Sequence, residues 1–448
     1  MKKIFVLLMV NVFGFSPAQN PEYAKSIDSL MNSFQQHNAF SGSVLLQKNG
    51  ETIYKGEFNK FGNASNKYRV GSITKVFTAI ITFQLIEEGK LALDTKLSQY
   101  YPGIKNADKI TIGNLLSHTS GIYNYLEWED YYISKTRKFT KKEMLDLINQ
   151  GKPAFKPGED CEYSNSNYLL LGYIMEDITQ KPYAENLNVR IVDKIGLLDT
   201  YFETDVKEYQ DRNTSYSFNG AEWLRETETH PSFTCAAGAV VSTAEDLSKL
   251  MHELLKGNLV SENSLAQMGK TNSEGIGYGL FRTPFYGRIG YGHSGKIDEF
   301  HSFVGYFPAD RLSICVLSNG NNVKLNEIVL GVASKYYGIA CQNPDFTTYK
   351  SETSPQAKIY GGVYKAKLIG LINVGTFQIS EAANNYLFLS MYEDGKNGEK
   401  VLLERRGENN FYARKNNAEF DFILDKRGKV TAMKLTQNKR SIACRKVM

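Results

Sequence analysis

Ser72 and Lys75, a serine and a lysine three positions apart, have the types and spacing for hydrolytic chemistry. A serine hydroxyl is a weak nucleophile until a base takes its proton. Side chains three residues apart lie on one face of a helix, and the run after Lys75 is almost wholly apolar, so burial should lower the lysine pKa. The start of a helix also offers backbone N–H groups that can stabilise an oxyanion. We therefore predict a nucleophile, Ser72, activated by a neutral lysine base, Lys75.

Two further patterns carry polar groups suited to acyl transfer. Tyr163 and Asn165 precede a predicted helix. A tyrosine held between cationic groups has a lowered pKa and relays protons. An asparagine amide can bind a substrate amide. His293, Gly295 and Lys296 lie on a predicted strand. The glycine permits close approach of a substrate, and the backbone N–H of Lys296 is a candidate second oxyanion donor. Taken alone, each pattern also fits a plain helix-entry turn or strand end.

The order and spacing of the three patterns resemble the serine β-lactamase and DD-peptidase superfamily, in its class C branch of D-aminopeptidases, penicillin-binding-protein-like peptidases and carboxylesterases. The resemblance covers roughly residues 29–319 and includes the segments 115–121 and 238–246, in which we expect His118 and Asp246 to cap and pack. It implies that Ser72 is acylated, that Lys75 and Tyr163 share the work of the base, and that Asn165 binds the substrate amide.

The third pattern departs from the β-lactam-specialised relatives, which usually carry Lys-Thr-Gly where this chain has His293-Ser-Gly. A histidine is only partly charged near neutral pH. We expect His293 to lie beside Tyr163 and to titrate within a unit or two of about 6.5. The difference implies small amide, peptide or ester substrates, including D-amino-acid peptides. A β-lactamase, a penicillin-binding carboxypeptidase and a non-catalytic protein that binds or senses wall fragments are the alternatives.

The elements that must position these groups indicate an α+β domain. A hairpin with an Asn49-Gly50 turn is predicted over 42–58, and a buried helix over 72–88. A mostly helical block follows over 112–255, with a helix over 168–178 and a capping box that begins at Ser242. Strands return at 286–292, 301–307 and 312–318, the last with Cys315 in the core. A sheet built from both ends of the chain with helices between them is an α+β arrangement.

The C-terminal part is predicted to be a separate β domain. A polar segment at 344–356 is the expected linker, and short strands recur through 357–448 at the spacing of a small barrel or sandwich. Segments 360–364 and 428–433 resemble the lipocalin-like domain that often follows such hydrolases. From Asp345 onward there are 18 Lys and Arg against 11 Asp and Glu, an excess of +7, whereas the whole chain carries +5. Weak contact with anionic envelope polymers is therefore expected.

The N-terminal residues 1–18 have the order of a secretory signal peptide: Lys2 and Lys3, an apolar run, then small residues. The hydrolase domain is then expected over 19–343, periplasmic or secreted, with no integral membrane segment after signal cleavage. The five cysteines form no C-x-x-C pair, so their disulfide pairing stays open. The six histidines are scattered along the sequence, so we expect no metal or other cofactor. The sequence has no basic stripe, so we expect no nucleic-acid partner.

Overall fold

The structure is a computed structural model that describes residues 21–61, 65–206, 211–346, 357–368, 372–393, 396–397 and 400–447. The predicted signal peptide, 1–18, and residues 347–356 of the predicted linker lie outside these ranges. No helix among the described residues is long and apolar enough to span a bilayer. All five cysteines are described, and all are free thiols.

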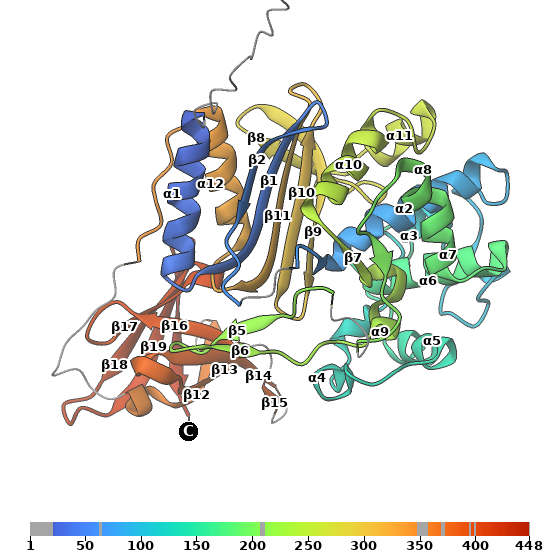
Figure 1. The fold of residues 1–448 in the computed structure, drawn as a ribbon. Helices are drawn as coiled ribbons and strands as arrows, with labels where there is room; N and C mark the ends of the chain where they lie inside the picture. The colour runs from blue at the N-terminus through green and yellow to red at the C-terminus, as the bar shows by residue number, and fades with distance from the viewer. Residues whose placement is uncertain are drawn as a thin grey trace, which may run out of the picture.

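A six-stranded antiparallel sheet forms the centre of the larger domain (Figure 1), in the order β2-β1-β11-β10-β9-β8. Its strands are β1 (Phe40–Lys48), β2 (Glu51–Glu57), β8 (Phe281–Phe285), β9 (Arg288–Ile297), β10 (Phe300–Phe307) and β11 (Leu312–Asn321). The predicted hairpin is present, with Asn49 and Gly50 at positive φ in its turn. Strands from the two ends of the domain pair directly, β1 with β11, as the α+β prediction requires.

Helices cover both faces of this sheet. On one face α1 (Glu22–Gln36) and α12 (Leu325–Tyr337) pack against each other and close one hydrophobic core. On the other face lies the helical block, which includes α2 (Thr74–Glu87), α6 (Asn165–Thr179) and α10 (Ala244–Leu255). Cys315 is fully buried on β11, as predicted.

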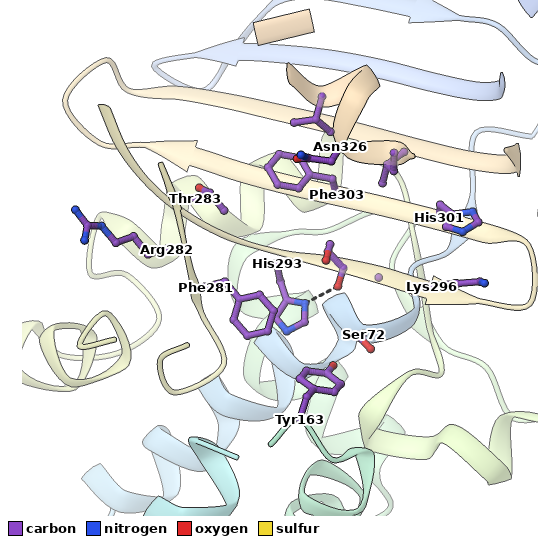
Figure 2. Close-up of a pocket in the computed structure, with 14 residues that line it drawn as sticks. Ser72, Tyr163, Phe281, Arg282, Thr283, His293, Lys296, His301, Phe303 and Asn326 are labelled. Atoms are coloured by element: carbon purple, nitrogen blue, oxygen red, sulfur yellow. Dashed lines mark hydrogen bonds between the residues drawn. The ribbon is translucent and has the colours of Figure 1, made fainter. Parts of the chain in front are cut away.

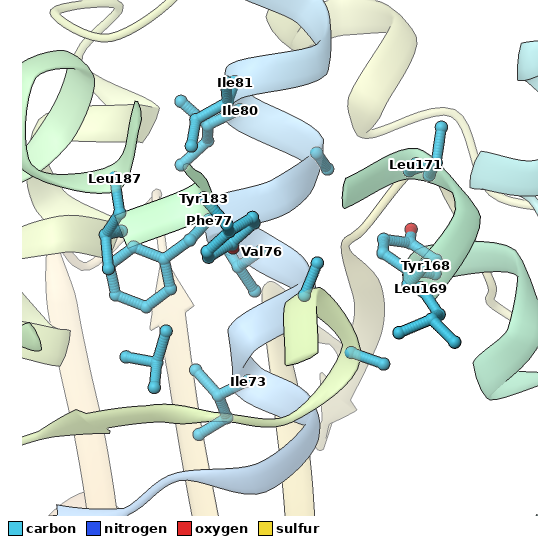
Figure 3. Packing of buried hydrophobic residues seen from close by; sticks show 14 of the residues in the cluster. Ile73, Val76, Phe77, Ile80, Ile81, Tyr168, Leu169, Leu171, Tyr183 and Leu187 are labelled. Carbon is cyan, nitrogen blue, oxygen red and sulfur yellow. The ribbon is translucent and has the colours of Figure 1, made fainter. Parts of the chain in front are cut away.

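Helix α2 is buried on every side, with all residues from Thr74 to Leu85 inaccessible or nearly so. Figure 3 shows this helix with Leu187 on one side and Leu169 on the other. A helix enclosed in this way carries apolar residues on nearly every face. Its first turn therefore places Lys75 in the interior of the domain, away from water.

Three local predictions differ from the structure. Helix α6 begins at Asn165, three residues before the predicted start. Thr243, not Ser242, caps α10 by accepting from the backbone N–H of Asp246, because the Ser242 hydroxyl contacts Thr200 instead. Ser72 itself lies in a short 3₁₀ turn, η1 (Gly71–Ile73), which precedes α2.

The C-terminal residues form a closed antiparallel barrel, which resolves the choice between barrel and sandwich and is consistent with a lipocalin-like domain. The strands follow the order β13-β12-β20-β19-β18-β17-β16-β14, and pairing of β13 with β14 closes the circle. They are β12 (Gly362–Leu368), β13 (Ile372–Glu381), β14 (Leu387–Glu393), β16 (Val401–Arg405), β17 (Asn410–Ala413), β18 (Ala418–Leu424), β19 (Val430–Gln437) and β20 (Arg440–Lys446), with β15 (Lys396–Asn397) added to β14. Its own hydrophobic core includes Tyr360, Tyr364 and Phe422.

Candidate active site

The Lys75 amine is held by three oxygens. Its Nζ lies 2.9 Å from Ser72 Oγ, 2.8 Å from Asn165 Oδ1 and 2.8 Å from the backbone carbonyl of Ala237. The two carbonyl oxygens can only accept, so they take two of the amine hydrogens. In a neutral amine the remaining position is a lone pair, and it faces the Ser72 hydroxyl. The geometry is therefore that of a base aimed at its nucleophile.

Burial favours that neutral form. Lys75 is fully inaccessible, and loss of solvation holds its pKa well below the ordinary lysine value, as the sequence predicted. None of its three hydrogen-bond partners is a carboxylate. Its Nζ lies 5.0 Å from the ring centroid of Tyr163 and 5.7 Å from that of Tyr168, contacts that support the cation only modestly.

Tyr163 stands beside the nucleophile as a protonated phenol. Its hydroxyl is directed toward Ser72 (Figure 2), is buried and does not complete a hydrogen bond. The expectation of a lowered pKa is wrong: burial raises the pKa of Tyr163 above its ordinary value, and the neighbouring Ser72 only partly offsets this. Tyr163 is therefore suited to donate a proton, not to act as a standing phenolate.

His118 caps and packs, as expected, and the side chain that it packs against is Tyr163. Its ring stacks on Tyr163 at 4.3 Å, and its Nδ1 accepts from the backbone N–H of Ser164, 3.2 Å away, at the entry to α6. Burial holds the pKa of His118 well below the usual histidine value. A neutral ring thus supports the face of Tyr163. Asp246 has the expected structural role, since it accepts from the backbone N–H of Asp199 and the hydroxyl of Thr200.

Asn165 contacts the base and does not line the pocket. Its Oδ1 accepts from Lys75, and its Nδ2 lies 3.3 Å from Asn124 Oδ1. The Asn165 side chain is thus held at both its oxygen and its nitrogen, and its backbone N–H also donates to Asn124 Oδ1. In this arrangement Asn165 orients Lys75.

His293 is a buried, neutral acceptor. Its Nδ1 lies 2.5 Å from the carbonyl of Ser294, which can only accept, so Nδ1 carries the ring proton and Nε2 has a lone pair. Nε2 is buried without a hydrogen-bond partner, and the ring stacks on Phe281 at 4.2 Å (Figure 2). Burial, with a smaller contribution from Lys75, lowers the pKa of His293 to about 3. The expectation that it titrates near neutrality is therefore wrong.

Gly295 and Lys296 bring strand β9 against the nucleophile turn. A Cβ added at Gly295 would lie 2.1 Å from the carbonyl of Val70 and 2.9 Å from the backbone nitrogen of Ser72. A Cβ at Gly71, whose φ is +52°, would lie 2.9 Å from backbone atoms of Lys296. Gly71 and Gly295 thus allow the Ser72 turn and strand β9 to touch, whereas any larger residue would push them apart. This contact places the backbone nitrogens of Ser72 and Lys296 at the same site.

A pocket of about 540 Å³ opens over these residues. Strand β8 pairs with β9 only over 288–292, so β10 alone pairs with the 293–297 stretch. The pocket follows this edge from Ser72, Tyr163 and His293 to residues near the start of α12, including Asn326 and Val329 (Figure 2). Its lining includes the cations Arg282 and Lys296 and no acidic side chain.

The sequence-predicted residues Ser72, Lys75, Tyr163, His293, Gly295 and Lys296 thus meet at one site, with Asn165 behind the base. Sequence reasoning missed Phe281, which lies on a strand that was not predicted, and it missed the contact of His118 with Tyr163. The described residues contain no group of three or more His, Cys, Asp or Glu side chains that could hold a metal ion.

Comparison with known proteins gives matches over most of the chain. A family model described as Beta-lactamase matches residues 26–329. The teichoic acid D-alanine hydrolase of Staphylococcus aureus is 28% identical over 348 residues, which cover 74% of this chain and 81% of the relative.

Among solved structures, a D-stereospecific amidohydrolase from Streptomyces sp. is 27% identical with a TM-score of 0.64, covering 71% of this chain and 100% of that one. A penicillin-binding protein homologue from Pyrococcus abyssi, 24% identical with a TM-score of 0.63, covers 94% of this chain and 100% of that one. At this identity the second likeness concerns the fold alone, and it extends over the barrel.

Proposed function

Since this chain belongs to the beta-lactamase family and is a serine hydrolase of amide or ester bonds, we propose that Ser72 is its nucleophile and that its substrates carry a D-amino acyl group. The observation that carries the first part is the Lys75 amine, which gives two hydrogens to carbonyl oxygens and turns its third position to Ser72 Oγ. Support for the second part is the substrate named in two relatives, D-alanine on teichoic acid and D-configured amides.

In the acylation step, Lys75 takes the proton of Ser72 as Oγ attacks the substrate carbonyl carbon. The backbone N–H groups of Ser72 and Lys296 receive the oxyanion. Collapse of the tetrahedral intermediate breaks the bond to the leaving group. Tyr163 donates its proton to the leaving atom and regains one from Lys75. Water then attacks the acyl-enzyme, again with Lys75 as the base, and releases the acid and free Ser72.

The pocket chemistry bears on the substrate class. His293 is neutral at physiological pH, so it offers an acceptor where β-lactam-specialised relatives offer a permanent cation. A substrate carboxylate gains no ion pair from His293, which disfavours the β-lactamase and carboxypeptidase alternatives. The cationic side chains of Arg282 and Lys296 instead line the pocket toward its rim. They suit a substrate in which the acyl group is attached to an anionic leaving group. A non-catalytic binding protein no longer fits, since it has no use for a buried lysine base.

We also propose that the protein acts outside the cytoplasm, on small substrates or acylated envelope polymers. Support comes from the signal-like order of residues 1–18 and from the cell-wall substrate of the Staphylococcus aureus relative. The division into a hydrolase domain over 19–343, a linker over 344–356 and a barrel over 357–448 is part of the same proposal.

The test of the substrate class compares kcat/KM for the D and L forms of alanyl p-nitroanilide, for the D and L forms of alanine methyl ester, and for nitrocefin. We expect the D-alanyl compounds to exceed their L counterparts by about tenfold or more, a difference of about 1.4 kcal/mol in transition-state binding. Nitrocefin should be the poorest substrate. Equal rates on D and L compounds, or nitrocefin as the best substrate, would remove the D-amino acyl assignment.

A further inference from the structure

Two of the contacts between the barrel and the hydrolase domain involve Glu299, three positions after the pocket residue Lys296, and the backbone at Asn219 and Gly220. Lys415 Nζ lies 2.8 Å from Glu299 Oε2, and the two side chains are only 17% and 13% exposed. At the second place the backbone N–H of Ala383 donates to the carbonyl of Asn219, 3.2 Å away. Gly220 lies at φ +98°, and a Cβ there would lie 2.8 Å from Tyr386 of the barrel. The barrel is thus closely fitted against this part of the hydrolase domain.

Glu299 belongs to the two-residue turn between β9 and β10, and its neighbour Asp298 is the centre of a buried ionic cluster. The Asp298 carboxylate accepts from Arg69 Nη1 at 3.0 Å, from Lys135 Nζ at 2.7 Å, and from the backbone N–H and hydroxyl of Thr229 at 2.9 and 2.8 Å. The Asp298 and Arg69 side chains are fully buried. Asp298 also adopts φ +51°, a backbone conformation that needs its surroundings to hold it.

This cluster connects the turn to both sides of the active site. Arg69 ends β3 (Tyr68–Arg69), three residues before Ser72. On the other side, Asp298 lies two residues after Lys296, and Gly295 and Lys296 contact the Ser72 turn. The second barrel contact, at Asn219 and Gly220, lies on the hairpin of β5 (Tyr216–Phe218) and β6 (Trp223–Arg225), which leads to Thr229. Both barrel contacts therefore act on segments that meet at Asp298.

We propose that Lys415 of the barrel is a positioning residue for the nucleophile, acting through Glu299 and the Asp298 turn on the contact between β9 and Ser72. The ion pair holds the turn, the turn places Asp298 on Arg69, and these contacts set the distance between the Ser72 and Lys296 backbone nitrogens. Lys415 and Glu299 do not line the pocket, so substrate affinity is not their role. The proposal rests on one part of the proposed function, Ser72 as the nucleophile, and not on the substrate.

The test measures the rate at which a fluorescent fluorophosphonate labels Ser72, together with kcat and KM for the best ester substrate, in the full-length protein. Lys415→Gln and Glu299→Gln should each lower the labelling rate and kcat about tenfold with KM nearly unchanged, because misplacement of the reacting groups affects the chemical step. The double variant should be no worse than either single one, since both break the same contact. Lys415→Arg should stay within about twofold of wild type.

Two further variants separate positioning from general destabilisation. The exchange Lys415→Glu with Glu299→Lys restores an ion pair and should recover most of the lost rate, although one residue is changed on each side of the contact. Lys434→Gln, the same change at an exposed lysine of β19, should leave the rate unchanged. A labelling rate within twofold of wild type in both single variants, or no recovery of the rate in the charge-exchanged variant, would overturn the proposal that Lys415 positions Ser72. Labelling of wild type at a serine other than Ser72 would instead defeat the nucleophile assignment in the proposed function.

Discussion

Gly295→Ala is the perturbation for which the structure gives the most direct magnitude. The added methyl would meet the Val70 carbonyl at 2.1 Å, the Ser302 hydroxyl at 2.5 Å and the Ser72 nitrogen at 2.9 Å. Real Cβ atoms essentially never approach closer than 3.0 Å, so β9 and the Ser72 turn must separate by 3.0 − 2.1 = 0.9 Å at the closest contact. A displacement of about 1 Å at a reacting centre lowers the rate on the order of 10²-fold.

We therefore expect Gly295→Ala to lower the rate of Ser72 labelling by fluorophosphonate about 100-fold. Overpacking should also lower the free energy of unfolding, by about 1–3 kcal/mol, which thermal unfolding by circular dichroism measures. The matched control is Gly103→Ala, where a Cβ meets nothing within 4 Å. It should label at the wild-type rate. A folded Gly295→Ala variant that labels within threefold of wild type would refute the argument that this glycine keeps β9 on the nucleophile.

Three other changes test the groups around Ser72. Lys75→Met should lower kcat/KM on the order of 10³-fold or more, because the nucleophile loses its activator. In the wild type, since the neutral amine is the active form, kcat/KM should rise with pH through the lowered pKa of Lys75; a rate that falls with rising pH over that limb would contradict a lysine base. Tyr163→Phe should lower kcat about 10²- to 10⁴-fold by removing a proton donor, and near-native kcat in this variant would leave Tyr163 a structural role only. His293→Gln should leave the shape of the kcat/KM profile unchanged between pH 5 and 8, because the pKa of His293 is about 3; loss of a limb in that window would show that the histidine titrates there after all.

The predictable part of the fold is the part set by local pattern. The Asn49-Gly50 turn, the buried helix after Ser72 and the strands β10 and β11 follow directly from turn chemistry and apolar runs. Strand β8 was missed because its five residues include Pro284, which is tolerated at a sheet edge but argues against a strand when only the sequence is read. The start of α6 was misplaced because its first residues are polar and are buried by tertiary contacts, such as that of Asn165 with Lys75.

The active site likewise has a part that the local sequence predicts and a part that depends on the tertiary fold. The Ser72 and Lys75 pair is local, so spacing alone predicts it. The ionisation of Tyr163 and His293 depends on how deeply the fold buries them, because desolvation is the largest cause of the pKa shift in both cases. The Asp298 cluster was not predicted because its partners Arg69 and Lys135 are 229 and 163 residues away in the chain. No local pattern indicates such a meeting.

The most direct measurement of the central claim is the site of acylation. Intact-mass and peptide mass spectrometry after reaction with a slow D-alanyl ester should show one acyl adduct, located on Ser72. Ser72→Ala should show no adduct and no hydrolysis while retaining its fold, since it loses only a hydroxyl. An adduct on any other residue, or hydrolysis that persists in Ser72→Ala, would contradict the account of Ser72 as a nucleophile activated by Lys75.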